Sequence, residues 1–150
     1  MKKQIARTFA AAFALSLLIS TAAHAQTARI TVVQVPFDFY AGQRLMPAGR
    51  YSVRPISQDG AKMLLIRSED GRTSAAVQTN TSADKAPSPG GSLTFRQYGD
   101  RYFLARIFIT SASAGREVPA SKAEKKLRND LRAKAARPDA KSVTVIGSVQ

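Results

Sequence analysis

The sequence contains no cysteine and no tryptophan, and its single histidine is His24. His24 lies within the first 25 residues, which have the pattern of a cleavable leader. The remaining 125 residues therefore carry neither an imidazole nor a thiol. Their absence excludes Ser-His-Asp and Cys-His catalysis, thiol redox chemistry and His/Cys zinc sites. No cofactor is expected.

Acidic residues are also scarce. The 150 residues include 10 Asp+Glu against 23 Lys+Arg, which gives a formal net charge of +13. This length is that of one ordinary domain. Beyond the leader no apolar stretch approaches the roughly 20 residues that a membrane-spanning helix needs, so the mature form should have no transmembrane segment.

The N-terminus has the three parts of an export signal. Lys2, Lys3 and Arg7 form a positive region without an acid, and residues 9–19 form an apolar run. The sequence AHA at 23–25 then offers a small-x-small cleavage site. We expect residues 1–25 to be removed, leaving a net charge of +10, and the protein to be periplasmic or extracellular.

Residues 26–118 alternate between polar and apolar residues in short runs separated by turn signals, as antiparallel strands do. The first run changes phase before Pro36, which predicts a bulge. The fold class expected is all-β with one C-terminal helix: a small antiparallel sandwich or barrel of six to seven strands. The expected strands are 29–40, 50–56, 62–67, 73–79, 93–98 and 101–110.

The C-terminal part changes character. Ser121 and Glu124 fit a capping box and Pro138 would end the helix, so residues 119–137 are expected to be helical. One narrow apolar face should dock this helix; it consists of Ala120, Ala123, Leu127, Leu131 and Ala135. Glu124 to Arg128 and Asp130 to Lys134 are spaced as ion pairs along the helix. Residues 138–150 are either a last strand or a flexible tail.

Four ordered blocks resemble one family of small exported bacterial β-rich proteins. The blocks are VPFDFYAG at 35–42, LMPAGRYSV at 45–53, YGDRYFLARIF at 98–108 and GREVPASKAEKKL at 115–127. Met46 and Val118 depart conservatively from the family pattern. The resemblance implies export and a β-rich fold. The family has no assigned activity, so it implies no catalytic residue.

The basic helix is the main candidate site. Its cations surround the side away from Leu127 and Leu131, and such a face could bind a polyanion such as lipopolysaccharide phosphate or anionic lipid. The sequence favours the simpler interpretation, a solvated face of a basic protein, because two leucines make a small apolar face. Nucleic acid is not expected, because no aromatic residue lies among the charges to stack on bases. The candidate residues are Lys122, Lys125, Lys126, Arg128, Arg132 and Arg137.

Isolated charged residues offer little chemistry. Asp38 lies between two phenylalanines and is expected to face solvent. Arg106 lies in an apolar run and could point inward, paired with a carboxylate. Glu69 and Asp70 precede a glycine, where acids are ordinary turn formers. No catalytic and no metal-binding residue is therefore assigned.

Three function classes follow. The favoured one is a non-enzymatic exported β-domain that binds an anionic envelope component or a protein partner. A carrier of a small apolar ligand is the first alternative, with a cavity lined by Tyr40, Tyr51, Tyr98 and Tyr102. A hydrolase with an unconventional carboxylate or Ser-Lys site is the second.

Overall fold

The computed structural model of the protein describes residues 30–56, 62–84, 90–109, 114–134 and 140–149. They form eleven strands and one helix, which confirms the all-β prediction with a C-terminal helix. The leader at 1–25 lies outside the described residues. The elements are β1 (Thr31–Val35), β2 (Phe39–Ala41), β3 (Arg44–Met46), β4 (Gly49–Pro55), β5 (Met63–Ser68), β6 (Ser74–Gln78), β7 (Asn80–Ser82), β8 (Ser92–Tyr98), β9 (Arg101–Phe108), β10 (Gly115–Glu117), α2 (Lys122–Ala133) and β11 (Lys141–Val149).

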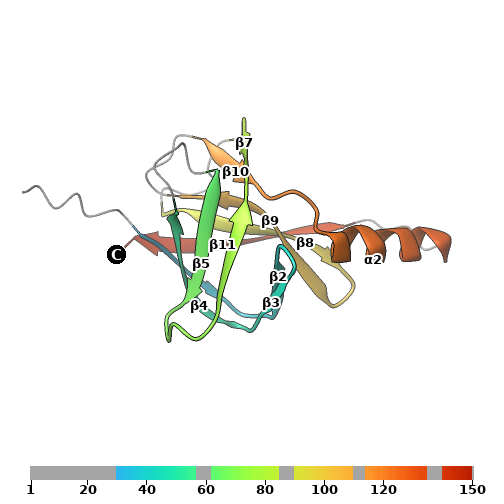
Figure 1. The fold of residues 1–150 in the computed structure, drawn as a ribbon, viewed down its shortest axis with the longest axis horizontal. Helices are drawn as coiled ribbons and strands as arrows, with labels where there is room; N and C mark the ends of the chain where they lie inside the picture. Colours follow the sequence, from blue (N-terminus) through green and yellow to red (C-terminus); the bar gives the residue numbers. More distant parts are fainter. Residues whose placement is uncertain (1–29, 57–61, 85–89, 110–113, 135–139, 150) are drawn as a thin grey trace, which may run out of the picture.

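The strands form one sheet that nearly closes into a barrel (Figure 1). Its order is β3-β2-β9-β8-β11-β1-β4-β5-β6. β7 follows β6 after the single residue Thr79 and pairs with β10. β10 in turn pairs with β9, so the end of the sheet at β6 is linked back to a strand within the sheet. Closure of this kind gives most strands two hydrogen-bonded neighbours. Six to seven strands were expected, and the number is larger because short three-residue strands complete the path.

The segment 138–150, which the sequence leaves open, contains a strand. β11 pairs with β8 from Lys141 to Ile146 and with β1 from Gly147 to Val149. It therefore joins the first and the eighth strand of the chain. The β-branched residues in SVTVIGSV explain this behaviour, because they favour a pleated sheet over other conformations.

The expected bulge in the first strand is wrong. Thr31, Val33 and Val35 all point inward, and β1 pairs with β4 in an unbroken register. The apparent change of phase arises because Thr31 is a buried polar residue, which a hydropathy pattern assigns to solvent. The strand ends before Pro36, which separates β1 from β2.

A bulge occurs instead between β8 and β9. Phe95 lies opposite Leu104 and Thr94 lies opposite Arg106, so Ala105 has no counterpart. The extra residue shifts the alternation by one position. Leu104 is consequently buried while Arg106 is exposed, so the inward orientation that the sequence left open for Arg106 does not occur. Its guanidinium pairs with Asp84 at 3.0 Å on the surface.

The interior of the barrel is filled by aliphatic and aromatic side chains. The ring of Phe39 contacts those of Tyr51 and Phe95, with both pairs of centroids 5.2 Å apart. Phe37 stacks on Tyr102 at 3.9 Å near the margin of this core. Edge-to-face and offset contacts of this kind add to the free energy of burial. The nearly closed sheet therefore surrounds a packed core.

Candidate anion-binding face of the C-terminal helix

Helix α2 begins where its cap predicts. The Ser121 hydroxyl oxygen accepts a hydrogen bond from the Glu124 backbone N–H at 3.2 Å, which satisfies one of the free donors of the first turn. The helix starts at Lys122 and ends at Ala133, so it is shorter than the expected range 119–137, of which 135–137 lie outside the described residues. Only half of the expected capping box is present, because the Glu124 side chain turns towards β8.

Glu124 is the buried residue that joins α2 to the sheet. Its Oε1 lies 2.6 Å from Arg96 Nε and its Oε2 lies 3.1 Å from Arg96 Nη2. The Tyr98 hydroxyl donates to Oε1 at 3.2 Å. Arg96 Nη2 also donates to the Val118 carbonyl at 3.2 Å. This two-pronged, charge-assisted contact is a strong and directional form of hydrogen bonding.

The environment of this cluster is largely dry. Glu124 is 1% exposed and the Arg96 side chain 25%. Burial raises the pKa of the Tyr98 hydroxyl, and the charge of Glu124 and the hydrogen bond to it raise the pKa further, while Arg96 and Arg128 act in the opposite direction. A buried carboxylate is tolerable only when its charge and lone pairs are matched, as they are here.

The apolar docking face expected for α2 is only partly correct. Leu127 and Leu131 are half-buried, but Ala123 is exposed, and Glu124 is the buried residue of the helix. Successive helical residues are rotated by about 100°, so Glu124 and Leu131 project in nearly the same direction and Ala123 projects well to one side. Ala120 is half-buried and Ala135 lies outside the described residues.

The expected ion pairs along the helix are replaced by the contact with β8. Glu124 pairs with Arg96, and in the described part of the chain neither Glu124–Arg128 nor Asp130–Lys134 forms a salt bridge. Arg128 projects only about 40° from Glu124, and it is half-buried as a result. The expectation that Arg128 faces solvent is therefore wrong. Its Nε is buried and has no hydrogen-bond partner among the described residues.

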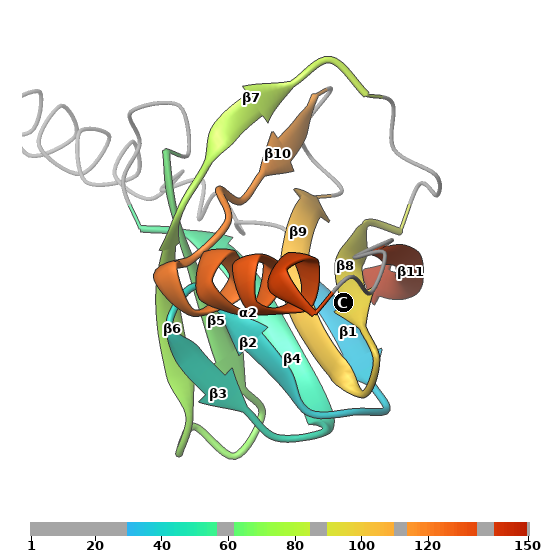
Figure 2. The same ribbon diagram turned by 90° about the vertical axis from the view of Figure 1, so that its right-hand side faces the viewer.

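The other cations of α2 face solvent. The exposed side chains are those of Lys122, Lys125, Lys126 and Arg132. Figure 2 shows α2 in front of the sheet, extending from beside β6 at its left-hand end towards β9 at its right-hand end. Arg137 lies outside the described residues. We call these four exposed residues the basic face.

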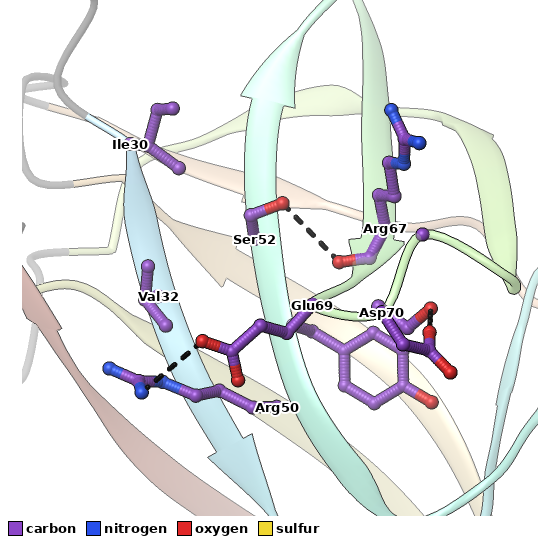
Figure 3. A pocket seen from close by; sticks show the side chains of 10 residues that line it. Ile30, Val32, Arg50, Ser52, Arg67, Glu69 and Asp70 are labelled. Atoms are coloured by element: carbon purple, nitrogen blue, oxygen red, sulfur yellow. Dashed lines mark hydrogen bonds and ion pairs between the residues drawn. The ribbon is translucent and has the colours of Figure 1, made fainter.

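A groove that sequence reasoning missed lies on the outer side of β1, β4 and β5. Its volume is about 580 Å³, and Ile30 and Val32 are among the residues that line it. Figure 3 shows Arg50 and Glu69 reaching towards one another across it, with 3.4 Å between Nη1 and Oε1. Arg67 lies on the same strand face. The groove presents charges of both signs and no cluster of one sign.

One of the two acids at this groove, Asp70, stabilises a turn with its side chain, as the sequence indicates. Asp70 accepts hydrogen bonds from the Ser68 hydroxyl and from the Arg72 backbone N–H. These hydrogen bonds, led by that from Ser68, lower the pKa of Asp70. The glycine that follows, Gly71, has a φ of 71°. Asp70 thus shapes the turn between β5 and β6, while the Glu69 carboxylate pairs with Arg50 on β4.

The remaining candidates are structural as well. Asp38 is exposed and accepts the backbone N–H of Ala48 at 2.7 Å, which holds the turn before β4. Tyr40 stacks on Phe103 at 4.9 Å outside the core. Tyr51 and Tyr98 are buried, and burial also raises the pKa of Tyr51. These tyrosines lie on different parts of the sheet and pack against protein.

The described residues lack two further features. They contain no group of three or more His, Cys, Asp or Glu side chains arranged to hold a metal ion. Within the same ranges, no helix has the length and apolarity required to cross a membrane. Comparisons of the chain with models of protein families, with curated proteins and with solved structures gave no match.

Proposed function

We propose that the mature chain is an exported, non-enzymatic β-domain protein that binds an anionic component of the bacterial envelope through the basic face of α2. The observation that supports this proposal is that α2 buries one of its two acids and exposes most of its cations. Glu124 is turned inward and neutralised by Arg96, so Asp130 is the one acid left on the exposed side of α2 in its described residues. Four cations remain exposed there.

Such a face suits a ligand with several phosphates or sulfates. Lys122, Lys125, Lys126 and Arg132 project within about one third of the helix circumference, and flexible lysines adapt to anions at different spacings. The attraction is long-range and weakens with ionic strength, because salt screens exposed charges beyond about 8 Å at physiological strength. Binding is therefore expected to depend strongly on salt and little on the detailed shape of the anion.

The export part of the proposal rests on the leader. The positive region, the apolar run and the AHA site agree with the resemblance to small exported bacterial proteins. N-terminal sequencing of the protein secreted from its host should begin at Gln26. A mature form that retains the residues from Met1 to Ala25 would contradict export with cleavage.

Packing favours binding at the surface over the two other function classes. A carrier needs an internal cavity, whereas Phe39, Tyr51 and Phe95 fill the barrel interior by contact with one another. A hydrolase needs converging acids, whereas Asp38 and Asp70 each accept hydrogen bonds that hold a turn. These contacts support a rigid scaffold that displays α2.

Heparin, a polysulfated chain, is a suitable probe of the basic face. The mature protein should be retained on immobilised heparin until the salt concentration is raised. A variant with Lys122, Lys125, Lys126 and Arg132 changed to Gln should elute at much lower salt. All four positions are exposed, so the fold should survive, with each change costing within about 0.5 kcal/mol.

A control with the same change in net charge makes the test specific. Arg44, Arg54, Arg72 and Arg101 are exposed and lie off the helix. Replacing these four with Gln should lower the elution salt only slightly. Equal shifts for the two variants would show that retention reflects net charge alone, and would contradict a binding role for α2. Repeating the elution with vesicles of anionic lipid and with an acidic protein as competitors would then separate a lipid from a protein partner.

A further inference from the structure

The two edges of β11 are paired to different extents. One edge is paired with β8 over six residues, from Lys141 to Ile146. The other edge is paired with β1 only from Gly147 to Val149. Among the described strands, none pairs with this second edge from Lys141 to Ile146. In Figure 2, β11 accordingly lies at the right-hand margin of the sheet.

The strands β1 and β11 separate at a corner. Val33 lies opposite Gly147, and the next residues of β1, Gln34 and Val35, pair only with β4. A Cβ atom at Gly147 would lie 2.8 Å from the Val32 carbonyl oxygen, so a glycine is needed where the two backbones approach most closely. The corner is therefore built into the fold, and the described strands leave the edge beyond it unpaired.

This edge has the properties of a template for another strand. Residues alternate in the direction of their backbone groups, so about three of the six direct an N–H and a C=O away from β8. Exposed edges in natural proteins are usually protected by proline, by bulges or by charged side chains. The sequence KSVTVI from Lys141 to Ile146 has no proline and no acid, and its single charge is at the start.

Apolar side chains lie beside the edge on both faces of the sheet, together with the polar Ser142 and Thr144 on the outer face. Ile146 is 61% exposed on the outer face. On the inner face Val143 is half-buried, and Val145 packs only partly against the core together with Phe37 and Tyr102. A strand added here would bury these groups and satisfy the backbone at the same time.

We propose that this edge pairs with the same edge of a second copy of the chain, in an antiparallel arrangement about a two-fold axis at Thr144. This register places Val143 opposite Val145 of the other copy and Ser142 opposite Ile146. Thr144 lies opposite itself, and threonine pairs across strands are favourable. The pairing is self-complementary, as a two-fold interface requires.

Charge also permits a second copy. Lys141 is the only charged residue of the edge, and the axis at Thr144 separates the two copies of Lys141 by about 20 Å along the strands. This exceeds the screening length of about 8 Å at physiological ionic strength. The proposal does not depend on anion binding, because the basic face of α2 takes no part in the pairing.

The oligomeric state of the mature protein tests the proposal. Sedimentation analysis from micromolar to millimolar concentration should show a reversible monomer–dimer equilibrium. Thr144 is exposed, so Thr144→Lys and Thr144→Glu should each retain the wild-type circular dichroism spectrum. Each variant alone should dimerise several-fold more weakly, because like charges would meet at the axis. An equimolar mixture of the two should recover the dimer, since opposite charges then meet.

Controls separate this edge from the rest of the surface. Ala76→Lys adds the same charge at an exposed position on β6 and should leave dimerisation unchanged. If the Thr144 variants fail to fold, the double variant Ser142→Lys with Ile146→Lys tests the same register through two like-charged contacts. A monomer at every concentration, or a dimer that Thr144→Lys leaves intact, would overturn the proposal. A monomer at every concentration would mean that a strand of another protein, and not a second copy, is the candidate to pair with this edge.

Discussion

The barrel interior and the docking face of α2 differ in what they bury. The interior buries a large set of aliphatic and aromatic side chains, among them Val33, Phe39 and Leu64, each at most 1% exposed. The docking face buries Glu124 and only half-buries Leu127 and Leu131. One region is thus stabilised by many small apolar contributions, and the other is positioned by one ion pair.

Because the barrel interior and the docking face of α2 bury different groups, substitutions in the two regions should have different effects on stability. Apolar burial contributes about 25 cal/mol per Å² and is spread over the whole core. A buried ion pair contributes little net stability, because desolvation offsets the attraction, but removing one partner is costly since the other charge remains buried. We therefore expect the helix to detach from the barrel without unfolding it, whereas core damage should unfold both.

The largest effect should come from the core. Phe39→Ala removes a ring that contacts both Tyr51 and Phe95, and it should lower the free energy of unfolding by about 3–5 kcal/mol. Urea denaturation followed by circular dichroism measures this loss. Leu45→Ala is the matched control, since Leu45 is 53% exposed and its loss should change stability within about 0.5 kcal/mol. Similar losses for the two variants would contradict the packed core.

The next effect concerns pH and the hydroxyl of Tyr98. Because the folded pKa of Tyr98 is raised above its ordinary value of 10.0, the unfolded state ionises first as the pH rises. Stability should therefore be fully present below about pH 10 and fall above it. Tyr98→Phe should make this alkaline loss smaller. Tyr51, whose pKa is also raised, should preserve part of it.

Tyr98→Phe should also lower the free energy of unfolding near neutral pH. Tyr98→Phe removes a hydrogen bond to a charged carboxylate, at a cost of roughly 1.5–3 kcal/mol. Urea midpoints at about pH 8 and about pH 11 measure both effects. An alkaline loss identical to that of the wild type would show that ionisation of Tyr98 is not coupled to folding.

A smaller effect should come from the cap of α2. Ser121→Ala leaves the Glu124 N–H without its partner and should destabilise the helix by about 1 kcal/mol. Faster amide hydrogen exchange within α2 is the measurement. Ser121→Asp should restore protection, because aspartate is an equally good N-cap. Loss of protection with both substitutions would mean that the hydroxyl acts by something other than capping.

The smallest effect should come from the surface. Asp84→Asn breaks the ion pair with Arg106, in which both side chains are about half exposed. Such pairs contribute about 0–1 kcal/mol, so the urea midpoint should barely move. A loss as large as that of Phe39→Ala would show that this pair is part of the core.

The same contrast explains what could be predicted from the sequence. Alternation, capping residues and turn residues are local signals, and they identified the β class, the N-cap of α2 at Ser121 and the turn at Glu69 and Asp70. The Arg96–Glu124 pair joins residues 28 positions apart, so no local pattern contains it. An arginine within the largely apolar strand LTFRQY was the one available signal.

Other differences have equally physical causes. The bulge at Ala105 reverses the orientation of Arg106, and a bulge in an otherwise regular strand has no residue signature here. Thr31 is buried although its type predicts exposure, which misplaced the bulge in β1. Segment 138–150 remained open because a final β-prone run becomes a strand only where neighbours exist to pair with it. β8 and β1 supply those neighbours.

Hydrogen exchange on the Glu124→Gln variant tests the central claim most directly. This change keeps the size of the side chain and removes the charge that pairs with Arg96. The amides of α2 should lose their protection while those of β4, β5, β8 and β9 keep theirs. Asp130→Asn, a change at an exposed acid of the same helix, should leave both sets unchanged. Undiminished protection of α2, or loss of protection in helix and strands together, would contradict the account that one ion pair positions this helix on an independently stable barrel.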